Sequence, residues 1–390
     1  MYVRDEAGLA RAVETLAGSP VLAIDTEFMR ERTYYARLCL VQIASETDVF
    51  AIDALPFGGS LPTLAPLLSD PASVKVFHAG SQDVEILLRA TGTVPSPLFD
   101  TQVAATVAGF PTQVGYGQLV SELIGVPIDK ADTFTDWAKR PLTDAQLRYA
   151  EEDVRHLPRV YALLRDRLAG EGRLGWLGED FERLADPATY EAVPAEQFRR
   201  VKRASTLDGR SLAVLREIAA WRETEAQRRD IPKRWLLSDE SLIEIARRRP
   251  ADAAALGAIR GVSERAASRS AGLLAAVRTG VAVPDDELPR LPKRRRPSSD
   301  AAPIADVLSG VLRLRAREHG VAATLLATRD ELERFAGGER DGHPLSEGWR
   351  HTIVGAELEA VLDGRSTVSI DEGRLVVRPA AACPEPSDAG

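Results

Sequence analysis

The sequence changes character near residue 190, and this change restricts the fold more than any other feature. Before it, β-type runs alternate with stretches of helical periodicity. The first β-type run opens at Val21, and later ones cover residues 37–45, 48–54 and 74–80. Only a short turn separates 37–45 from 48–54, which favours an antiparallel hairpin after the first strand. The order predicts a mixed α/β sheet, with helices near 5–17, 81–91, 101–108, 115–124 and 143–168.

Beyond residue 190 the β-type runs disappear, so we expect a mixed α/β domain at 1–190 and helical units after it. Residues 207–282 have apolar side chains at helical spacing and predict a compact helical domain. Residues 283–303 are rich in Pro, Ser and charge, which is typical of a linker. A second helical unit is expected at 304–378. It closes with a β-hairpin at 366–377 that turns at Glu372-Gly373, and 379–390 are expected to be a disordered tail.

The composition, 44% hydrophobic and 28% charged residues, is that of a soluble globular protein. The two cysteines, Cys39 and Cys383, lie far apart, which argues against a disulfide framework and favours the reducing cytoplasm. The N-terminus lacks a signal-peptide pattern, and no stretch is apolar enough to span a membrane. We therefore expect a soluble cytoplasmic protein.

Charge is distributed unevenly along the chain. Residues 1–198 contain 17 Lys and Arg against 29 Asp and Glu, whereas residues 199–300 contain 23 against 14. An acidic first domain and a basic middle indicate either a polyanion-binding surface beside a catalytic domain or simply solvated helix faces. The charge counts alone do not separate these two interpretations.

The first strand carries an unusual pair of acids, Asp25 and Glu27. Side chains two residues apart in a strand point to the same face, so these carboxylates repel each other. A divalent cation between them would make the arrangement favourable, since Mg²⁺ prefers oxygen ligands. Two such ions about 4 Å apart can clamp the attacking and leaving oxygens of a phosphodiester cleavage. This chemistry requires further acids from separate elements.

The helix expected at 143–168 supplies one of these acids. It opens with Thr143 followed three residues later by Gln146, a capping-box pattern. Tyr149 and Asp153 stand four residues apart and are therefore neighbours beside the apolar stripe. Pro158 is expected to kink the helix just after this pair.

A further acid has two candidates. Asp83 lies in the first turn of the helix that follows the strand 74–80, at a strand end of the kind that opens onto functional sites. Asp100 directly precedes another helix, where its role as an N-cap is convincing. We therefore choose Asp83.

Together these residues resemble a known family. Asp25-Thr26-Glu27, Asp83 and Tyr149-x-x-x-Asp153 resemble the motifs of the DEDD exonuclease superfamily, in its branch with a tyrosine, DEDDy. The longer segments "DTEFMRERTYYARLCLVQIA", "FHAGSQDVEILL" and "RPLTDAQLRYAEEDVRHL" resemble the bacterial ribonuclease D family. Residues 207–280 look like a helicase-and-RNase-D C-terminal (HRDC) domain, and 304–377 resemble the family's second such domain. The resemblance covers nearly the whole chain.

The resemblance implies a ribonuclease-H-like exonuclease domain followed by two small all-α, HRDC-like domains. The implied activity is 3′→5′ trimming of RNA, notably tRNA precursors, with release of nucleoside 5′-monophosphates by a monomer. If the family's residue roles are transferred to the matching positions, four acids would hold two Mg²⁺ or Mn²⁺ ions, with Asp25 as the bridging ligand. Tyr149 would orient the attacking water or help to deprotonate it. The four acids are Asp25, Glu27, Asp83 and Asp153.

Four neighbours carry weaker expectations, each with a structural alternative. Phe28 is a candidate for stacking on the terminal base or for core packing. Thr26 is a candidate for a backbone hydrogen bond to the terminal nucleotide, with its side chain in the core. His78 is a candidate substrate contact, although a lone His is more often structural. Gln42 is expected to be a solvated strand residue, with a hydrogen bond to substrate as the alternative.

The basic middle of the chain is a candidate for gripping the RNA body through its phosphates, without sequence readout. We expect the three domains to form a ring or funnel around the RNA end. Two alternatives remain, a DNA-directed exonuclease of the same branch and a noncatalytic RNA-binding scaffold. The substrate-gripping residues proposed are Arg228, Arg229, Lys233 and Arg234.

Overall fold

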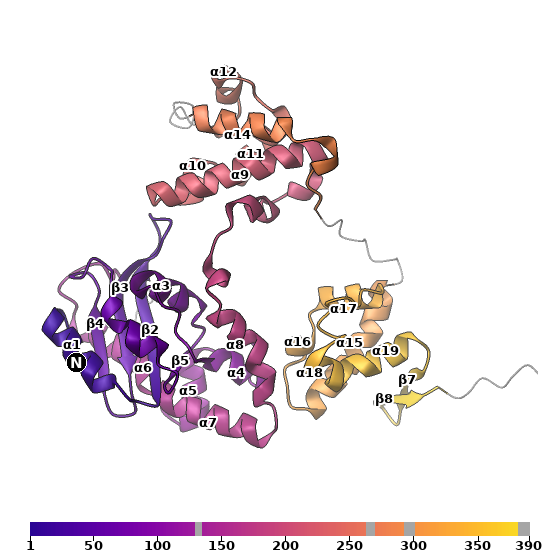
Figure 1. The fold of residues 1–390 in the computed structure, drawn as a ribbon. Coiled ribbons are helices and arrows are strands. Elements are labelled where there is room, and N and C mark those ends of the chain that lie inside the picture. Colours follow the sequence, from indigo (N-terminus) through magenta and orange to yellow (C-terminus); the bar gives the residue numbers. More distant parts are fainter. Residues whose placement is uncertain (129–134, 263–269, 292–300, 381–390) are drawn as a thin grey trace, which may run out of the picture.

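The computed structural model describes residues 1–128, 135–262, 270–291 and 301–380. These residues form three bodies (Figure 1): an α/β body that contains the large sheet, a helical body built around α9, and a second helical body that ends in the β7–β8 hairpin. The expected α/β domain followed by helical units is confirmed. No helix in the described part of the chain combines the length and apolar character needed to cross a membrane.

The large sheet has six strands in the order β1-β4-β3-β2-β5-β6. Strands β2 and β4 each pair antiparallel with β3, whereas β1 pairs in parallel with β4, β5 with β2, and β6 with β5, which confirms the mixed sheet. The two edge strands were not predicted because two or three residues are too few to show a periodic pattern. The strands are β1 (Tyr2–Val3), β2 (Val21–Met29), β3 (Arg37–Ala44), β4 (Val49–Asp53), β5 (Val74–Phe77) and β6 (Leu98–Asp100).

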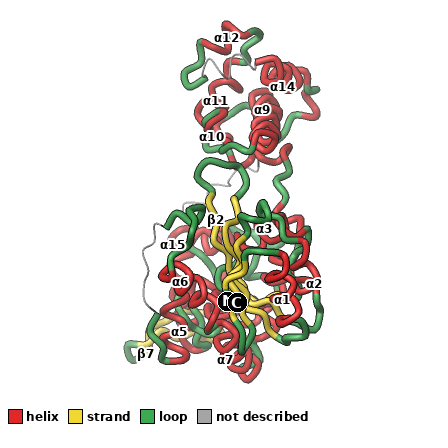
Figure 2. The backbone as a smooth tube through the Cα atoms, turned by 90° about the vertical axis from the view of Figure 1, so that its left-hand side faces the viewer, coloured by secondary structure: helices red, strands yellow, loops and turns green. Residues whose placement is uncertain are grey.

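Helices cover both faces of this sheet (Figure 2). Helices α1 (Glu6–Leu16), α2 (Ala65–Ser69) and α3 (Ser81–Thr91) pack on one face. The other face is covered by α4 (Thr101–Val107), α5 (Tyr116–Ile124), α6 (Asp144–Arg155) and α7 (Leu157–Gly170). The strand residues that meet this second group of helices include the small side chains Ala23 and Ala44. Small residues allow the helices to approach the sheet closely.

The stretch expected to form one kinked helix over 143–168 forms two helices, α6 and α7, which meet at His156. The predicted capping box between Thr143 and Gln146 is present at the start of α6. Pro158 is the second residue of α7, where its missing N–H costs no helical hydrogen bond. The proline therefore breaks the helix rather than only bending it, and Asp153 lies in the last turn before the break.

The second body consists of helices around the long helix α9, and its core includes Leu215, Ile218, Leu242 and Leu273. Its helices are α9 (Gly209–Arg229), α10 (Lys233–Leu236), α11 (Asp239–Arg248), α12 (Ala253–Gly257) and α14 (Ser270–Ala282). Helix α8 (Gly178–Ala185) and short 3₁₀ turns between residues 187 and 206 connect it to the first body.

The third body packs its helices around Leu308, Leu312, Phe335 and Leu358. The final hairpin turns at Glu372 and Gly373, as predicted, and both residues have positive φ. The expected linker 283–303 and tail 379–390 lie partly outside the described residues. The elements are α15 (Ala301–Glu318), α16 (Ala323–Leu326), α17 (Arg329–Ala336), α18 (Gly348–Arg350), α19 (Ala356–Leu362), β7 (Ser366–Asp371) and β8 (Arg374–Pro379).

The third body docks directly on the first. The rings of Trp176 and Trp349 stack in parallel, with centroids 4.6 Å apart. Nearby, the hydroxyls of Thr112 and Thr324 lie 2.7 Å apart. A side chain at Gly109 would collide with the backbone of the third body, because a Cβ there would come within 2.3 Å of a carbonyl oxygen. The contact therefore combines aromatic stacking with a close backbone approach that only glycine permits.

Candidate active site

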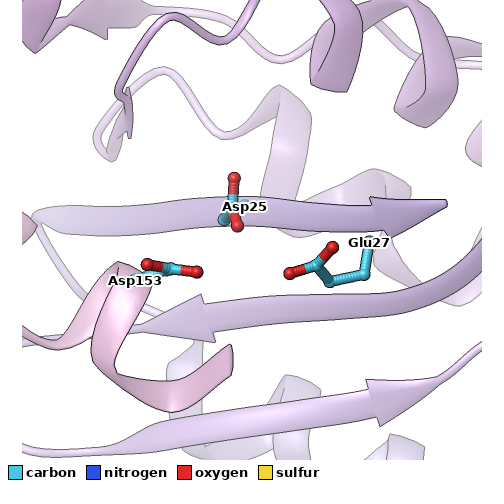
Figure 3. A group of neighbouring side chains, drawn as sticks. All are labelled: Asp25, Glu27 and Asp153. Carbon is cyan, nitrogen blue, oxygen red and sulfur yellow. The ribbon is translucent and has the colours of Figure 1, made fainter. Parts of the chain in front are cut away.

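Three acids from two segments meet at one place on the sheet. Asp25 and Glu27 lie on β2, and Asp153 projects toward them from α6 (Figure 3). One carboxylate oxygen from each residue lies within 4.8 Å of the others, and all three side chains are half-buried. The structure thus brings together three of the four acids proposed from the sequence.

The packing of α6 on the sheet determines this arrangement. Strand alternation puts Asp25 and Glu27 on the face that α6 covers. The segment entering α6 is held by Arg140, whose Nε and Nη2 each donate to the buried Asp53 carboxylate over 2.6 Å. Trp137, in the same segment, lies beside the ring of Tyr149 with centroids 6.1 Å apart. The helix that carries Asp153 is therefore anchored to β4 before it reaches the acids.

The fourth acid, Asp83, approaches from the first turn of α3 and is only 8% exposed. Its Oδ1 accepts a hydrogen bond of 2.5 Å from the Thr26 hydroxyl, so it stands apart from the group of three. Thr26 is buried, as expected for its side chain. Gly80 makes the turn into α3 possible, because a Cβ there would lie 2.4 Å from the Cβ of Phe77.

The rival acid Asp100 has a structural role. Its carboxylate accepts hydrogen bonds from the backbone N–H groups of Gln102 and Val103, which makes it the N-cap of α4. It also accepts from the backbone N–H groups of Ala79 and Gly80, the turn that leads into α3. This geometry supports the choice of Asp83, whose position Asp100 helps to fix.

The acids raise one another's pKa values. The pKa of Asp25 lies well above its usual range, first because of desolvation and then because of the carboxylates of Asp83, Asp153 and Glu27. Desolvation followed by repulsion from Asp153 and Asp83 raises the pKa of Glu27 to about 8. Desolvation raises the pKa of Asp153 to about 7, although a hydrogen bond from Tyr149 opposes this shift. Without a compensating positive charge the cluster therefore retains protons near neutral pH.

The donor chemistry of this cluster fits a divalent cation. Carboxylate oxygens are the preferred ligands of hard ions such as Mg²⁺ and Mn²⁺. Desolvated acids that repel one another lose this repulsion when a cation lies among them. Asp25, Glu27 and Asp153 are thus the described residues best placed to hold one.

Comparisons with known proteins identify the family. Residues 1–169 match a family model for a 3′–5′ exonuclease, and residues 211–277 match the HRDC domain. The chain is 47% identical to Ribonuclease D of Gluconacetobacter diazotrophicus over 374 residues, which cover 95% of both chains. It is 46% identical to Ribonuclease D of Granulibacter bethesdensis, covering 93% of this chain and 92% of the relative. The chain belongs to the ribonuclease D family.

A solved structure agrees with this assignment. The crystal structure of Escherichia coli RNase D, described as an exoribonuclease involved in structured RNA processing, superposes with a TM-score of 0.81 at 30% identity. The match covers 93% of this chain and 98% of that one. As a ribonuclease D family member, the chain is a 3′–5′ exoribonuclease that acts on RNA, and the acidic cluster indicates that it uses a divalent metal.

Tyr149 lies beside the acids, as its spacing from Asp153 predicts. Its side chain is half-buried, and its hydroxyl is hydrogen-bonded to Asp153. Desolvation, together with the charges of Asp153, Glu27 and Asp25, raises its pKa, so the phenol keeps its proton at neutral pH. The hydroxyl thus lies close to the carboxylates of the cluster.

Tyr116 is a second tyrosine near the acids, and no role is predicted for it from the sequence. Its hydroxyl donates to the carbonyl of Glu152 over 2.8 Å and accepts from the backbone N–H of His156 at 3.3 Å. These two groups are four residues apart and would bond directly in an unbroken helix. The phenol thus occupies the junction of α6 and α7, next to Asp153. No local sequence pattern signals such an insertion, because its partners lie 36 and 40 residues away.

The other sequence-based candidates have mixed outcomes. Both ring nitrogens of His78 already have hydrogen-bond partners. Its Nδ1 lies 3.0 Å from the Thr101 hydroxyl, and its Nε2 lies 3.0 Å from the Val114 carbonyl. Hydrogen bonds within the first body thus occupy His78, which argues against the proposed substrate contact. Phe28 is partly buried and packs against the core on the α1 side of the sheet. Gln42, expected to be solvated, is fully buried.

The proposed gripping residues lie where the second body meets the first. Tyr34, in the β2–β3 loop, donates its hydroxyl to the buried carboxylate of Glu223 on α9. Lys233 pairs with Glu223 at 3.0 Å and lies over the Tyr34 ring. Arg228 and Arg229 both pair with Glu225. Arg234 is exposed, and the β2–β3 loop beside this basic end of α9 leads back along β2 to Asp25.

The raised pKa values predict how pH affects stability and metal binding. An acid whose pKa is higher in the folded state binds more protons there, so raising pH lowers the free energy of unfolding. For Glu27 and Asp153 this loss runs from about pH 4, where the unfolded groups titrate, up to their folded pKa values of about 8 and about 7. We expect metal-free protein to melt at a lower temperature at pH 8 than at pH 6. Added Mn²⁺ should raise the melting temperature more at pH 8, where fewer protons compete.

Differential scanning fluorimetry with and without Mn²⁺ measures both effects. The Glu27→Gln variant is the control, since it removes one of the titrating groups and should reduce the dependence on pH. An Mn²⁺-induced shift of equal size at pH 6 and pH 8 would contradict the assignment of these protons to the metal ligands.

Proposed function

We propose that this chain trims RNA from the 3′ end by hydrolysis with two divalent cations, Mg²⁺ or Mn²⁺, and releases nucleoside 5′-monophosphates. The observation that carries this proposal is the convergence of Asp25, Glu27 and Asp153 within 4.8 Å in a member of the ribonuclease D family. Asp83 is the fourth proposed ligand, because its charge reaches Asp25 although its oxygen now pairs with Thr26.

The proposed roles follow from position. An oxygen of Asp25 lies within 4.8 Å of an oxygen of each of the other two acids, which suits the bridging role. Bound cations would neutralise the carboxylates and stabilise the charge that develops on the phosphate. Tyr149, hydrogen-bonded to Asp153, would orient the attacking water. Thr26 and Phe28, on the same strand, are proposed to border the terminal nucleotide, Thr26 through its backbone.

The RNA body is proposed to approach through the space between the first two bodies. A cavity of about 730 Å³ lies there, lined by basic side chains, by Tyr34 and Tyr35, and by Glu85, Glu191 and Glu223. Aromatic rings can stack on bases, and arginine and lysine can bind phosphates. The basic lining residues are Arg30, Arg89, Arg200 and Lys233.

Arg228, Arg229 and Lys233 are paired with glutamates, so RNA phosphates would replace these carboxylates as partners. Such exchange should make binding dependent on salt. Arg234 is exposed and could meet a phosphate without first breaking an ion pair, since none involving it occurs among the described residues. We further propose that the enzyme is a cytoplasmic monomer and that tRNA precursors are among its substrates.

The test compares three substrates of one sequence: a 3′-labelled linear RNA, the matching DNA and a circular RNA. With Mg²⁺ or Mn²⁺, we expect labelled mononucleotide from the linear RNA, while the circular RNA, which has no 3′ end, persists. Removal of the metal with EDTA should stop the reaction, and excess Mn²⁺ should restore it. Equal digestion of DNA would favour a DNA-directed exonuclease. RNA binding without any digestion would favour a noncatalytic scaffold.

A further inference from the structure

The side-chain amide of Gln42 is buried next to the acids without a hydrogen-bond partner. The residue lies in β3 and is 0% exposed. Neither Nε2 nor Oε1 makes a hydrogen bond to any of the described residues. Buried polar groups are nearly always paired in folded proteins, and an unpaired one is costly. An unpaired buried amide is therefore evidence for a hydrogen-bond partner that the described residues do not supply in this arrangement.

The strand register places this amide beside Asp25. Gln42 is directly opposite Asp25 on β2 and opposite Ala51 on β4. Residues directly opposite in neighbouring strands share a face, with Cβ atoms about 5 Å apart. The shared face is the one covered by α6, where the core around the site includes Ala150 and Val154.

Few polar groups on this face are within reach of the amide. The diagonal neighbour Asp53 on β4 already accepts hydrogen bonds from Arg140, Tyr2 and a backbone N–H. The neighbours Ala23 and Ala51 have no polar side chain. The remaining groups are the acids of the cluster: Asp25 directly opposite, Glu27 on the diagonal, and Asp153, which projects toward both from α6. The amide is therefore placed to serve the acidic cluster.

We propose that Gln42 is a positioning residue for the cation site, donating its amide N–H to the inner oxygen of Asp25 so that the outer oxygen faces the metal. This inference rests on the proposed cation site. A carboxylate is a stronger hydrogen-bond acceptor than a neutral group, so Asp25 is a suitable partner for the amide. Hydrogen bonds of this kind orient metal ligands and tune their affinity. A neutral amide provides the hydrogen bond without adding charge to the site.

If Gln42 served only to fill space in the core, an amide would be a poor choice at this position. An apolar side chain of similar size would fill the same space without burying two unpaired polar atoms. Gln42→Met is such a substitution, with an unbranched side chain of comparable length. If Gln42 serves the metal, this variant should lose metal affinity while the metal-free protein keeps or gains stability. If Gln42 serves the fold, stability should fall and metal affinity should not change.

The experiment measures Mn²⁺ binding by titration calorimetry and the melting temperature of the metal-free protein. For Gln42→Met we expect the Kd for Mn²⁺ to rise by about 10- to 100-fold, with an unchanged or higher melting temperature. Gln102→Met is the matched control, because its Nε2 donates to the Val114 carbonyl over 3.1 Å. That variant should melt at a lower temperature and bind Mn²⁺ normally. Gln42→Leu replaces Gln42→Met if the latter is not recovered folded.

The outcomes separate this inference from the proposed function. If the unsubstituted protein binds no Mn²⁺, the proposed cation site fails and the role of Gln42 fails with it. If that protein binds Mn²⁺ and the Gln42 variant binds it equally well, only the role of Gln42 is overturned. A lower melting temperature of the variant with unchanged Mn²⁺ affinity would also assign Gln42 to the fold.

Discussion

Asp25→Asn is expected to slow hydrolysis at the RNA 3′ end by about 10³-fold or more, while RNA binding persists. The substitution keeps the shape of the side chain but removes the charge proposed to bridge the cations, whose electrostatic stabilisation accounts for several kcal/mol of the barrier. Single-turnover digestion and filter binding of the same labelled RNA measure the two quantities. A rate within about tenfold of the unsubstituted enzyme would remove Asp25 from the catalytic group.

The same variant should stabilise the metal-free protein at pH 8. Asn places no charge among the carboxylates that now raise the pKa of Asp25. Asp100→Asn is the matched control, because the Asp100 carboxylate accepts hydrogen bonds from four backbone N–H groups. Its amide would turn a donor toward some of them and lower stability by about 1–3 kcal/mol. Opposite shifts of the melting temperature would distinguish a functional acid from a structural one. A lower melting temperature for Asp25→Asn would instead indicate a role in folding.

Tyr149→Phe is expected to lower kcat by about 10²- to 10³-fold with little change in KM for RNA. The substitution removes only the hydroxyl that is hydrogen-bonded to Asp153 and proposed to orient the attacking water. The ring contact with Trp137 should persist, so the fold around α6 is preserved. Steady-state kinetics together with direct RNA binding separate the two parameters.

Tyr190→Phe is the matched control for this prediction. Tyr190 is also half-buried; it lies in the connection between the first two bodies and lines the cavity proposed for the RNA body, so the comparison concerns kcat. Its hydroxyl donates to the Leu184 carbonyl over 2.7 Å. Its loss should cost some stability and leave kcat unchanged. Equal losses of turnover and RNA affinity in Tyr149→Phe would show that Tyr149 supports the structure of the site rather than the reaction.

Features that depend only on local sequence patterns, such as strand alternation and helical spacing, were predictable from the sequence. The strands at 37–45 and 48–54 are long enough to show a β-type composition, and the structure has β3 and β4 there. The start of α6 was signalled by the capping box of Thr143 and Gln146. Strand alternation put Asp25 and Glu27 on one face, and helical spacing made Tyr149 and Asp153 neighbours. All of these inferences relate residues that are only a few positions apart in the sequence.

Features that depend on distant partners were not predictable. Gln42 lies in a strand whose residues from Leu38 to Ala44 are all buried, so no alternation marks its environment. Because both faces of β3 are covered, hydrophobic pattern alone could not distinguish a solvated amide from a buried one. Tyr116 and His78 are likewise defined by partners more than 20 residues away.

The sequence by itself determined which residues are acids, which segments become strands or helices, and which side chains share a face of one element. Tertiary structure alone decided that α6 lies across β2, so that Asp153 meets Asp25 and Glu27 while Asp83 turns to Thr26. The physical reason is that periodicity acts within one element, whereas the meeting of elements depends on how their buried faces pack. The charge repulsion of the cluster exists only once that packing has formed.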